Sequence, residues 1–118
     1  MLSICKCLFV TISFVVPLLA CASNPHCDGK DSWAASMAFV HLKNANILTN
    51  DDVDFSKTEV LLLASELKDD GLYLQLHKVN YYKISGDRIT VITENMASTS
   101  ECSESPVKVY LVSKIYGA

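Results

Sequence analysis

The chain has 118 residues, half of them hydrophobic, and a formal net charge of −3 from 10 basic and 13 acidic side chains. This length suits one compact domain. The mild acidity argues against a nucleic-acid-binding protein, which would need a basic face. It is compatible with a basic protein partner, although ordinary solubility also explains it.

Residues 1–20 are expected to form a signal peptide. Their only charged residue is Lys6, which is followed by an uncharged, mostly apolar run from Cys7 to Leu19. A transmembrane helix needs about 20 apolar residues, whereas this run is shorter and contains Pro17. The sequence therefore predicts an exported protein whose leader is removed.

The leader ends in a short motif, LLAC at residues 18–21, which resembles the lipobox of bacterial lipoprotein precursors. The resemblance implies that the Cys21 thiol is acylated and becomes the first mature residue. Each buried methylene of the acyl chains would contribute about 0.8 kcal/mol to membrane anchoring. The alternative is an ordinary A-x-A cleavage site, with Ala20 and Ala22 before Ser23. We favour the lipobox because cysteine is uncommon and stands at the one position that acylation requires.

The same resemblance implies a location. The second mature position holds Ala22 and not aspartate, which favours the outer membrane of a Gram-negative cell, with the domain facing the periplasm. A secreted protein is the alternative. Residues 21–32 are then expected to form a tether and residues 33–118 a single domain.

Two cysteines remain after either cleavage. Cys5 and Cys7 leave with the leader, and Cys21 is either acylated or removed, so Cys27 and Cys102 are left as a pair. In an oxidising compartment such a pair predicts a disulfide, which would stabilise the fold by roughly 4.5 kcal/mol by closing a loop of about 75 residues. Metal binding and a redox dithiol are the weaker alternatives, because the chain lacks close ligand spacing and a C-x-x-C motif.

The first predicted element of the mature chain is a helix over residues 33–46, with Asp31 or Ser32 as its N-cap. Its expected inner face is rich in small residues: Ala34, Ala35, Ala38, Leu42 and Ala45. Residues 48–56 form a polar, acidic loop. This loop lacks the ordered ligands, glycine and terminal glutamate of a calcium-binding EF-hand, so we expect it to be solvated.

From residue 57 onward the sequence has the period of two that is typical of β-strands. We expect strands at residues 58–67, 72–84, 88–94 and 107–116, with a turn at 85–87 and a polar loop at 95–106. In the second strand the leucines at 72, 74 and 76 alternate with Tyr73, Gln75 and His77. The apolar phase then shifts to Val79 and Tyr81, which predicts a β-bulge near Lys78.

These elements predict an α+β fold in which one N-terminal helix packs on a four-stranded antiparallel meander sheet. The order of elements is similar to that of the cystatin-like folds. Cystatins, however, carry a Q-x-V-x-G hairpin signature, and no glycine follows Gln75 at that spacing. Inhibition of cysteine proteases is therefore not supported, and the fold alone predicts no function.

No motif in the sequence indicates catalysis or a cofactor. The chain has no G-x-S-x-G and no phosphate-binding glycine loop, and Glu66, Asp69 and Asp70 fall in an expected solvated turn. His41, near the helix stripe, and His77, on the expected polar strand face, are assigned structural roles. Only His26 beside Cys27 keeps open a periplasmic binder of a metal or other small ligand. We expect a non-enzymatic protein with no cofactor and no metal site.

The tyrosines suggest a binding surface. Tyr73 and Tyr81 share one face of their strand, as Tyr110 and Tyr116 do on the last strand, with charges between them. Tyrosine is enriched at interfaces, although an ordinary outer sheet face would look the same. The first hypothesis is a lipid-anchored protein-binding domain of the inhibitor or immunity type. The second is a structural or assembly accessory lipoprotein of the outer membrane.

Overall fold

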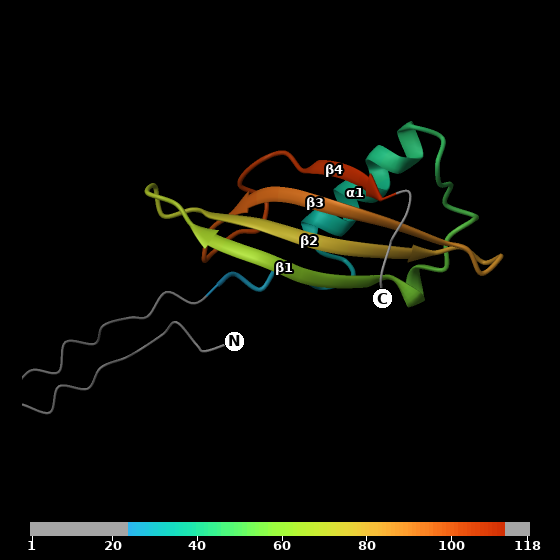
Figure 1. Ribbon diagram of the computed structural model, residues 1–118, viewed down its shortest axis with the longest axis horizontal. Coiled ribbons are helices and arrows are strands. Elements are labelled where there is room, and N and C mark those ends of the chain that lie inside the picture. Colours follow the sequence, from blue (N-terminus) through green and yellow to red (C-terminus); the bar gives the residue numbers. More distant parts are fainter. Residues whose placement is uncertain (1–23, 113–118) are drawn as a thin grey trace, which may run out of the picture.

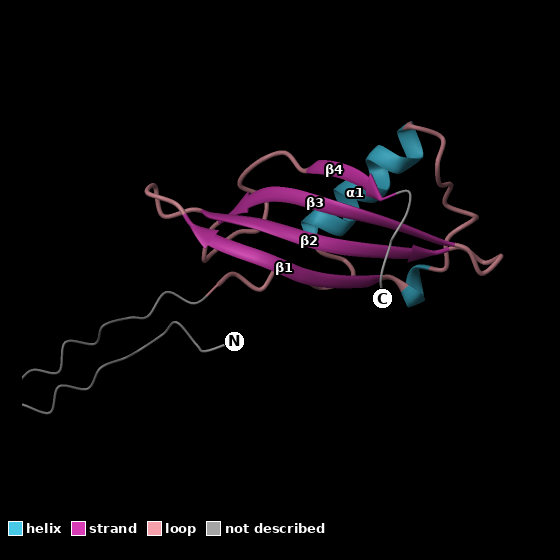
Figure 2. Ribbon diagram, viewed as in Figure 1, coloured by secondary structure: helices cyan, strands magenta, loops and turns pink. Residues whose placement is uncertain are grey.

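The computed structural model describes residues 24–112. The expected signal peptide, Cys21 and Tyr116 lie outside the described residues. Within them, one helix packs on one face of a four-stranded antiparallel sheet, as Figures 1 and 2 show. The predicted α+β fold is therefore confirmed.

Helix α1 spans Trp33–Asn44, and its ends have clear local causes. The Ser32 hydroxyl oxygen accepts a hydrogen bond from the Ala35 N–H at 3.3 Å, which caps the first turn. At the other end Asn46 has a positive φ of 60°, and the Ile47 N–H donates to the Leu42 carbonyl at 2.9 Å. This closing bond is that of a Schellman motif, so the helix stops two residues before its predicted end.

The sheet is a meander with strand order β1-β2-β3-β4. Its strands are β1 Glu59–Leu67, β2 Tyr73–Tyr82, β3 Arg88–Ala97 and β4 Lys108–Val112. A single-turn 3-10 helix, η1 (Phe55–Lys57), begins in the last two residues of the stretch that we expected to be an acidic loop. Strand β3 extends three residues beyond its predicted end, where the Met96 N–H donates to the Ser105 hydroxyl at 2.8 Å.

The predicted bulge near Lys78 is wrong. Strands β2 and β3 pair without interruption from Tyr73↔Ala97 to Tyr82↔Arg88. The irregularity lies in β1 instead, between Leu62 and Ala64. Strand β2 needs no bulge because its inward face is one unbroken row, Tyr73, Gln75, His77, Val79 and Tyr81, and all five side chains are buried.

One half of the inward sheet face is apolar and lies under α1. Its core combines residues of α1, of the segment between α1 and η1, and of β2 and β3: Ala35, Ala38, Leu42, Leu48, Val53, Val79, Tyr81 and Val91. Phe39 contacts Phe55 of η1 edge to face, with ring centres 4.9 Å apart. The predicted inner residues Ala34, Ala35, Ala38 and Leu42 are buried, whereas Ala45 is exposed.

The other half of the inward face is polar. Its four residues are Gln75, His77, Thr93 and Asn95, none more than 3 % exposed. Residues 24–28, which we call the strap, and the loop at residues 98–107 lie against this end of the sheet. The predicted Cys27–Cys102 disulfide is present and joins the two, with a Cα–Cα distance of 5.7 Å.

Candidate protein-binding surface

The face of the sheet opposite α1 carries one row of four residues that crosses every strand. Leu61 of β1 pairs with Lys78 of β2, Lys78 pairs with Ile92 of β3, and Ile92 pairs with Tyr110 of β4. Because side chains alternate along a strand, these residues point away from the buried Val79 and Val91. Leu61 is 55 % exposed and Tyr110 is 50 % exposed. We call this row and its apolar neighbours Ala64, Leu74, Leu76 and Met96 the outer face.

Lys78 is the cation at the centre of the outer face. Within the described part of the chain it forms no ion pair, whereas the nearby Lys108 lies 3.6 Å from a Glu94 carboxylate oxygen. Glu59 is also engaged, because its Oε1 accepts from the Tyr82 hydroxyl at 2.5 Å and from the Asn80 amide at 3.3 Å. These bonds, that from Tyr82 first, hold the pKa of the Glu59 carboxyl below its usual range. Arg88 and Lys78 act on Glu59 more weakly, from a distance, so among the described residues Lys78 still has no carboxylate in direct contact with it.

The tyrosine surface is not formed as predicted. Tyr73 and Tyr81 are 4 % and 1 % exposed, so neither can contact a partner. Tyr110 does lie on the outer face, and Tyr116 is outside the described residues. The sequence interpretation missed Leu61, Lys78 and Ile92. For Lys78 the orientation alone could have been predicted, because placing Val79 and Tyr81 inward makes the even-numbered residues of β2 point outward.

Strand β1 extends the outer face to the edge of the sheet. Leu61 and Leu63 are about half exposed, at 55 % and 48 %, and no charged residue lies between Glu59 and Glu66. Leu67 is also 55 % exposed, but it pairs with the inward Tyr73 and so lies on the other face. Edge strands of soluble proteins are usually protected by charges, prolines or bulges, and the bulge at Leu63 is the protection found here. Leu61 nevertheless adds apolar contact area beside Lys78.

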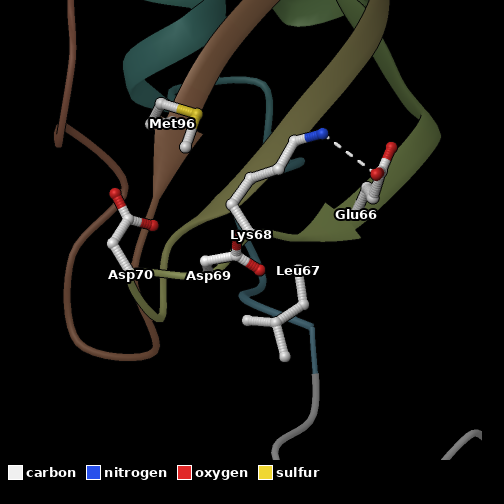
Figure 3. Close-up of a pocket in the computed structure, with 6 residues that line it drawn as sticks. All are labelled: Glu66, Leu67, Lys68, Asp69, Asp70 and Met96. Atoms are coloured by element: carbon white, nitrogen blue, oxygen red, sulfur yellow. Dashed lines mark hydrogen bonds and ion pairs between the residues drawn. The ribbon is translucent and has the colours of Figure 1, made fainter.

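A shallow hollow of about 540 Å³ lies at the β1–β2 turn (Figure 3). Its lining residues are Glu66, Leu67, Lys68, Asp69, Asp70 and Met96. The Lys68 ammonium lies 2.9 Å from a Glu66 oxygen, and Asp70 accepts from the Leu72 N–H at 3.2 Å, which caps the turn. These carboxylates hold the turn together, and the hollow contains no nucleophile paired with a base.

The histidines do not come together. His26 and His41 are exposed, and His77 is fully buried although we expected it on a polar face. Desolvation by burial holds the pKa of His77 below its usual value, while Asp28 of the strap acts in the opposite direction. In residues 24–112 no group of three or more His, Cys, Asp or Glu side chains is placed to bind a metal ion.

Comparison with known proteins identifies no family and no relative for this chain. Searches against protein-family models, curated proteins and solved structures returned no match to this chain. In the part of the chain that the structure describes, no helix has the length and apolar character needed to cross a membrane.

Proposed function

We propose that this chain is an exported, non-enzymatic protein, anchored to the outer membrane through an acylated Cys21, that binds another protein through its outer face. The observation that supports the proposal best is the row Leu61, Lys78, Ile92 and Tyr110. In it a partly buried lysine, without an ion pair among the described residues, lies between the exposed Leu61 and Tyr110 and beside the partly buried Ile92. Inhibition of the bound protein, as by an immunity protein, is the activity that such a domain would have.

The chemistry of the row favours one kind of partner. A lysine surrounded by apolar side chains loses water on binding and then favours a carboxylate placed opposite it, because leaving a buried charge unpaired is costly. Tyr110 offers a broad contact with little conformational entropy to lose. We therefore propose a partner whose contact surface is apolar with an acidic residue at its centre.

The size of the face is consistent with a specific but modest interface. Four strands about 4.8 Å apart and about eight residues long cover about 500 Å². A standard interface buries about 800 Å² on each partner. The remaining area would have to come from side chains at the edge of this face, such as the half-exposed Leu63 at the β1 bulge.

A capture experiment with matched variants tests this proposal. The processed protein, its Lys78→Glu variant and its Lys43→Glu variant are each used as bait on envelope and secreted fractions, with quantitative mass spectrometry. Lys43 is an exposed residue of α1, on the other side of the sheet, so it controls for the change of charge. The proposal requires a protein retained by the wild type and by Lys43→Glu but lost with Lys78→Glu. Equal retention by all three baits would contradict it.

A further inference from the structure

The polar half of the inward face contains more unpaired polar atoms than a packed core normally tolerates. Gln75 pairs across the strands with Asn95, and His77 pairs with Thr93. Within the described part of the chain five of their buried atoms have no hydrogen-bond partner: Gln75 Oε1, His77 Nδ1, His77 Nε2, Thr93 Oγ1 and Asn95 Oδ1. Buried polar atoms are nearly always hydrogen-bonded, so this concentration in four adjacent residues indicates a site for a polar ligand.

The backbone groups that cover this site accept hydrogen bonds from the nitrogen of each side-chain amide but donate none to its oxygen. Gln75 Nε2 donates to the Pro25 carbonyl of the strap at 3.2 Å, and Asn95 Nδ2 donates to the Cys102 carbonyl at 2.9 Å. Both amides therefore already hold a backbone carbonyl, while both amide oxygens remain without a donor. Gln75 Nε2 also donates to the Ser65 hydroxyl at 3.2 Å, and Pro25, which has no N–H, cannot itself donate to Gln75 Oε1.

A residue other than proline, in an extended conformation, has the backbone N–H that Gln75 Oε1 lacks. In a β-strand the N–H and C=O groups of one residue point to the same side, so a facing group can donate to one and accept from the other. The amide of Gln75 has the matching donor and acceptor. We infer that Gln75, His77, Thr93 and Asn95 line a groove for an extended polypeptide segment of a partner protein, and that the strap is an imperfect occupant of that groove.

The disulfide controls access to the groove. Cys27 is buried two residues after Pro25 and ties the strap to Cys102, so the strap cannot leave while the S–S bond is intact. A dithiol reductant supplies two electrons and its two thiol protons. The Cys27–Cys102 bond breaks to give two thiols, and the dithiol becomes a disulfide. The strap is then held only by noncovalent contacts, and a peptide with an N–H at the position of Pro25 can displace it.

Two synthetic peptides test the inference. Both copy residues 22–32 with Cys27→Ser, and one also carries Pro25→Ala, which supplies the missing N–H. Binding to the reduced processed protein is followed by NMR through the side-chain amide signals of Gln75 and Asn95. The Pro25→Ala peptide should bind about fivefold tighter, the effect of about one hydrogen bond. The difference should disappear in a Gln75→Leu protein, and the oxidised protein should bind neither peptide.

Equal affinity of the two peptides for the reduced protein, or equally tight binding to the oxidised protein, would overturn the inference. A second measurement needs no reduction. In the oxidised protein carrying Pro25→Ala, the new amide proton at position 25 should exchange with solvent at least tenfold more slowly than in the Pro25→Ala, Gln75→Leu double variant. Equal exchange rates would overturn the inference even if the reduced protein unfolds. Neither measurement involves Lys78, so a result that contradicts the groove leaves the proposal for the outer face untouched, and the reverse also holds.

Discussion

The hydroxyl of Tyr81 donates a hydrogen bond to the backbone carbonyl of Ala35, and so joins the sheet directly to the first turns of α1. The ring of Tyr81 is 1 % exposed and belongs to the apolar core. One side chain thus supplies both packing area and the polar contact that sets where the helix lies across the sheet.

Replacing this residue, Tyr81→Phe, should keep the packing and lose the hydrogen bond. We expect the free energy of unfolding to fall by about 1 kcal/mol, the usual net value of one such bond. Urea denaturation at neutral pH measures this change. A variant as stable as the wild type would show that the contact with Ala35 does not contribute.

The same residue predicts a loss of stability in alkali. Burial raises the pKa of the Tyr81 hydroxyl well above its ordinary value of about 10. The unfolded chain therefore releases this proton first, so the contribution of Tyr81 is complete below about pH 10 and is lost as the pH rises further. Urea denaturation between pH 9 and pH 11 should show a steeper decline for the wild type than for Tyr81→Phe. Parallel curves would contradict this assignment.

The burial of His77 predicts that the free energy of unfolding depends on pH in the acidic range. Because burial lowers its pKa, the ring is neutral in the fold and the unfolded chain protonates first. Stability from this residue is present above about pH 6.5 and should fall as the pH drops below that value. His77→Gln should remove this part of the pH dependence, which urea denaturation at a series of pH values measures. The same pH profile for His77→Gln and the wild type would exclude His77 as its source.

The Cys27–Cys102 disulfide should contribute a large share of the stability. Closing a loop with a sequence separation of 75 residues is expected to contribute up to roughly 4.5 kcal/mol. The double variant Cys27→Ser, Cys102→Ser should lose between about 2 and 4.5 kcal/mol in urea denaturation and keep the circular dichroism of the folded sheet. Two free thiols in the purified oxidised protein would contradict the pairing.

Much of this fold could be predicted from local patterns, because the helix stripe, the strand period and the N-cap depend on neighbouring residues. The disulfide was predicted from the expected processing of the leader, which would leave Cys27 and Cys102 as a pair. The orientation of β2 could not be predicted in this way. Its leucines suggested one inward phase, whereas Gln75 is inward because it holds the Pro25 carbonyl of a segment 50 residues away.

The candidate surface was missed for the same reason. Once Tyr73 and Tyr81 are inward, Lys78 becomes the centre of the outer face, and no local pattern distinguishes it from an ordinary surface lysine. The bulge in β1 is equally non-local, because it adjusts the register of Leu62 and Ala64 to their partners in β2.

Acylation of Cys21 has a direct test in the full-length precursor. The variant Cys21→Ser should be recovered in soluble fractions without incorporated fatty acid, because the thiol that carries the acyl chain is absent. Metabolic labelling with a radioactive or clickable fatty acid, followed by membrane fractionation, measures both properties. Continued membrane retention with acyl label on the variant would contradict the lipobox interpretation.

The outer face is proposed to bind a protein through Lys78. Isothermal titration calorimetry with the captured partner measures this directly, using the wild type, Lys78→Glu and Lys43→Glu. We predict that Lys78→Glu raises the dissociation constant at least tenfold, because the new carboxylate would face the acidic residue proposed on the partner. Lys43→Glu should change the dissociation constant less than twofold. Equal affinity of Lys78→Glu and the wild type would show that the partner binds elsewhere and would contradict the proposed surface.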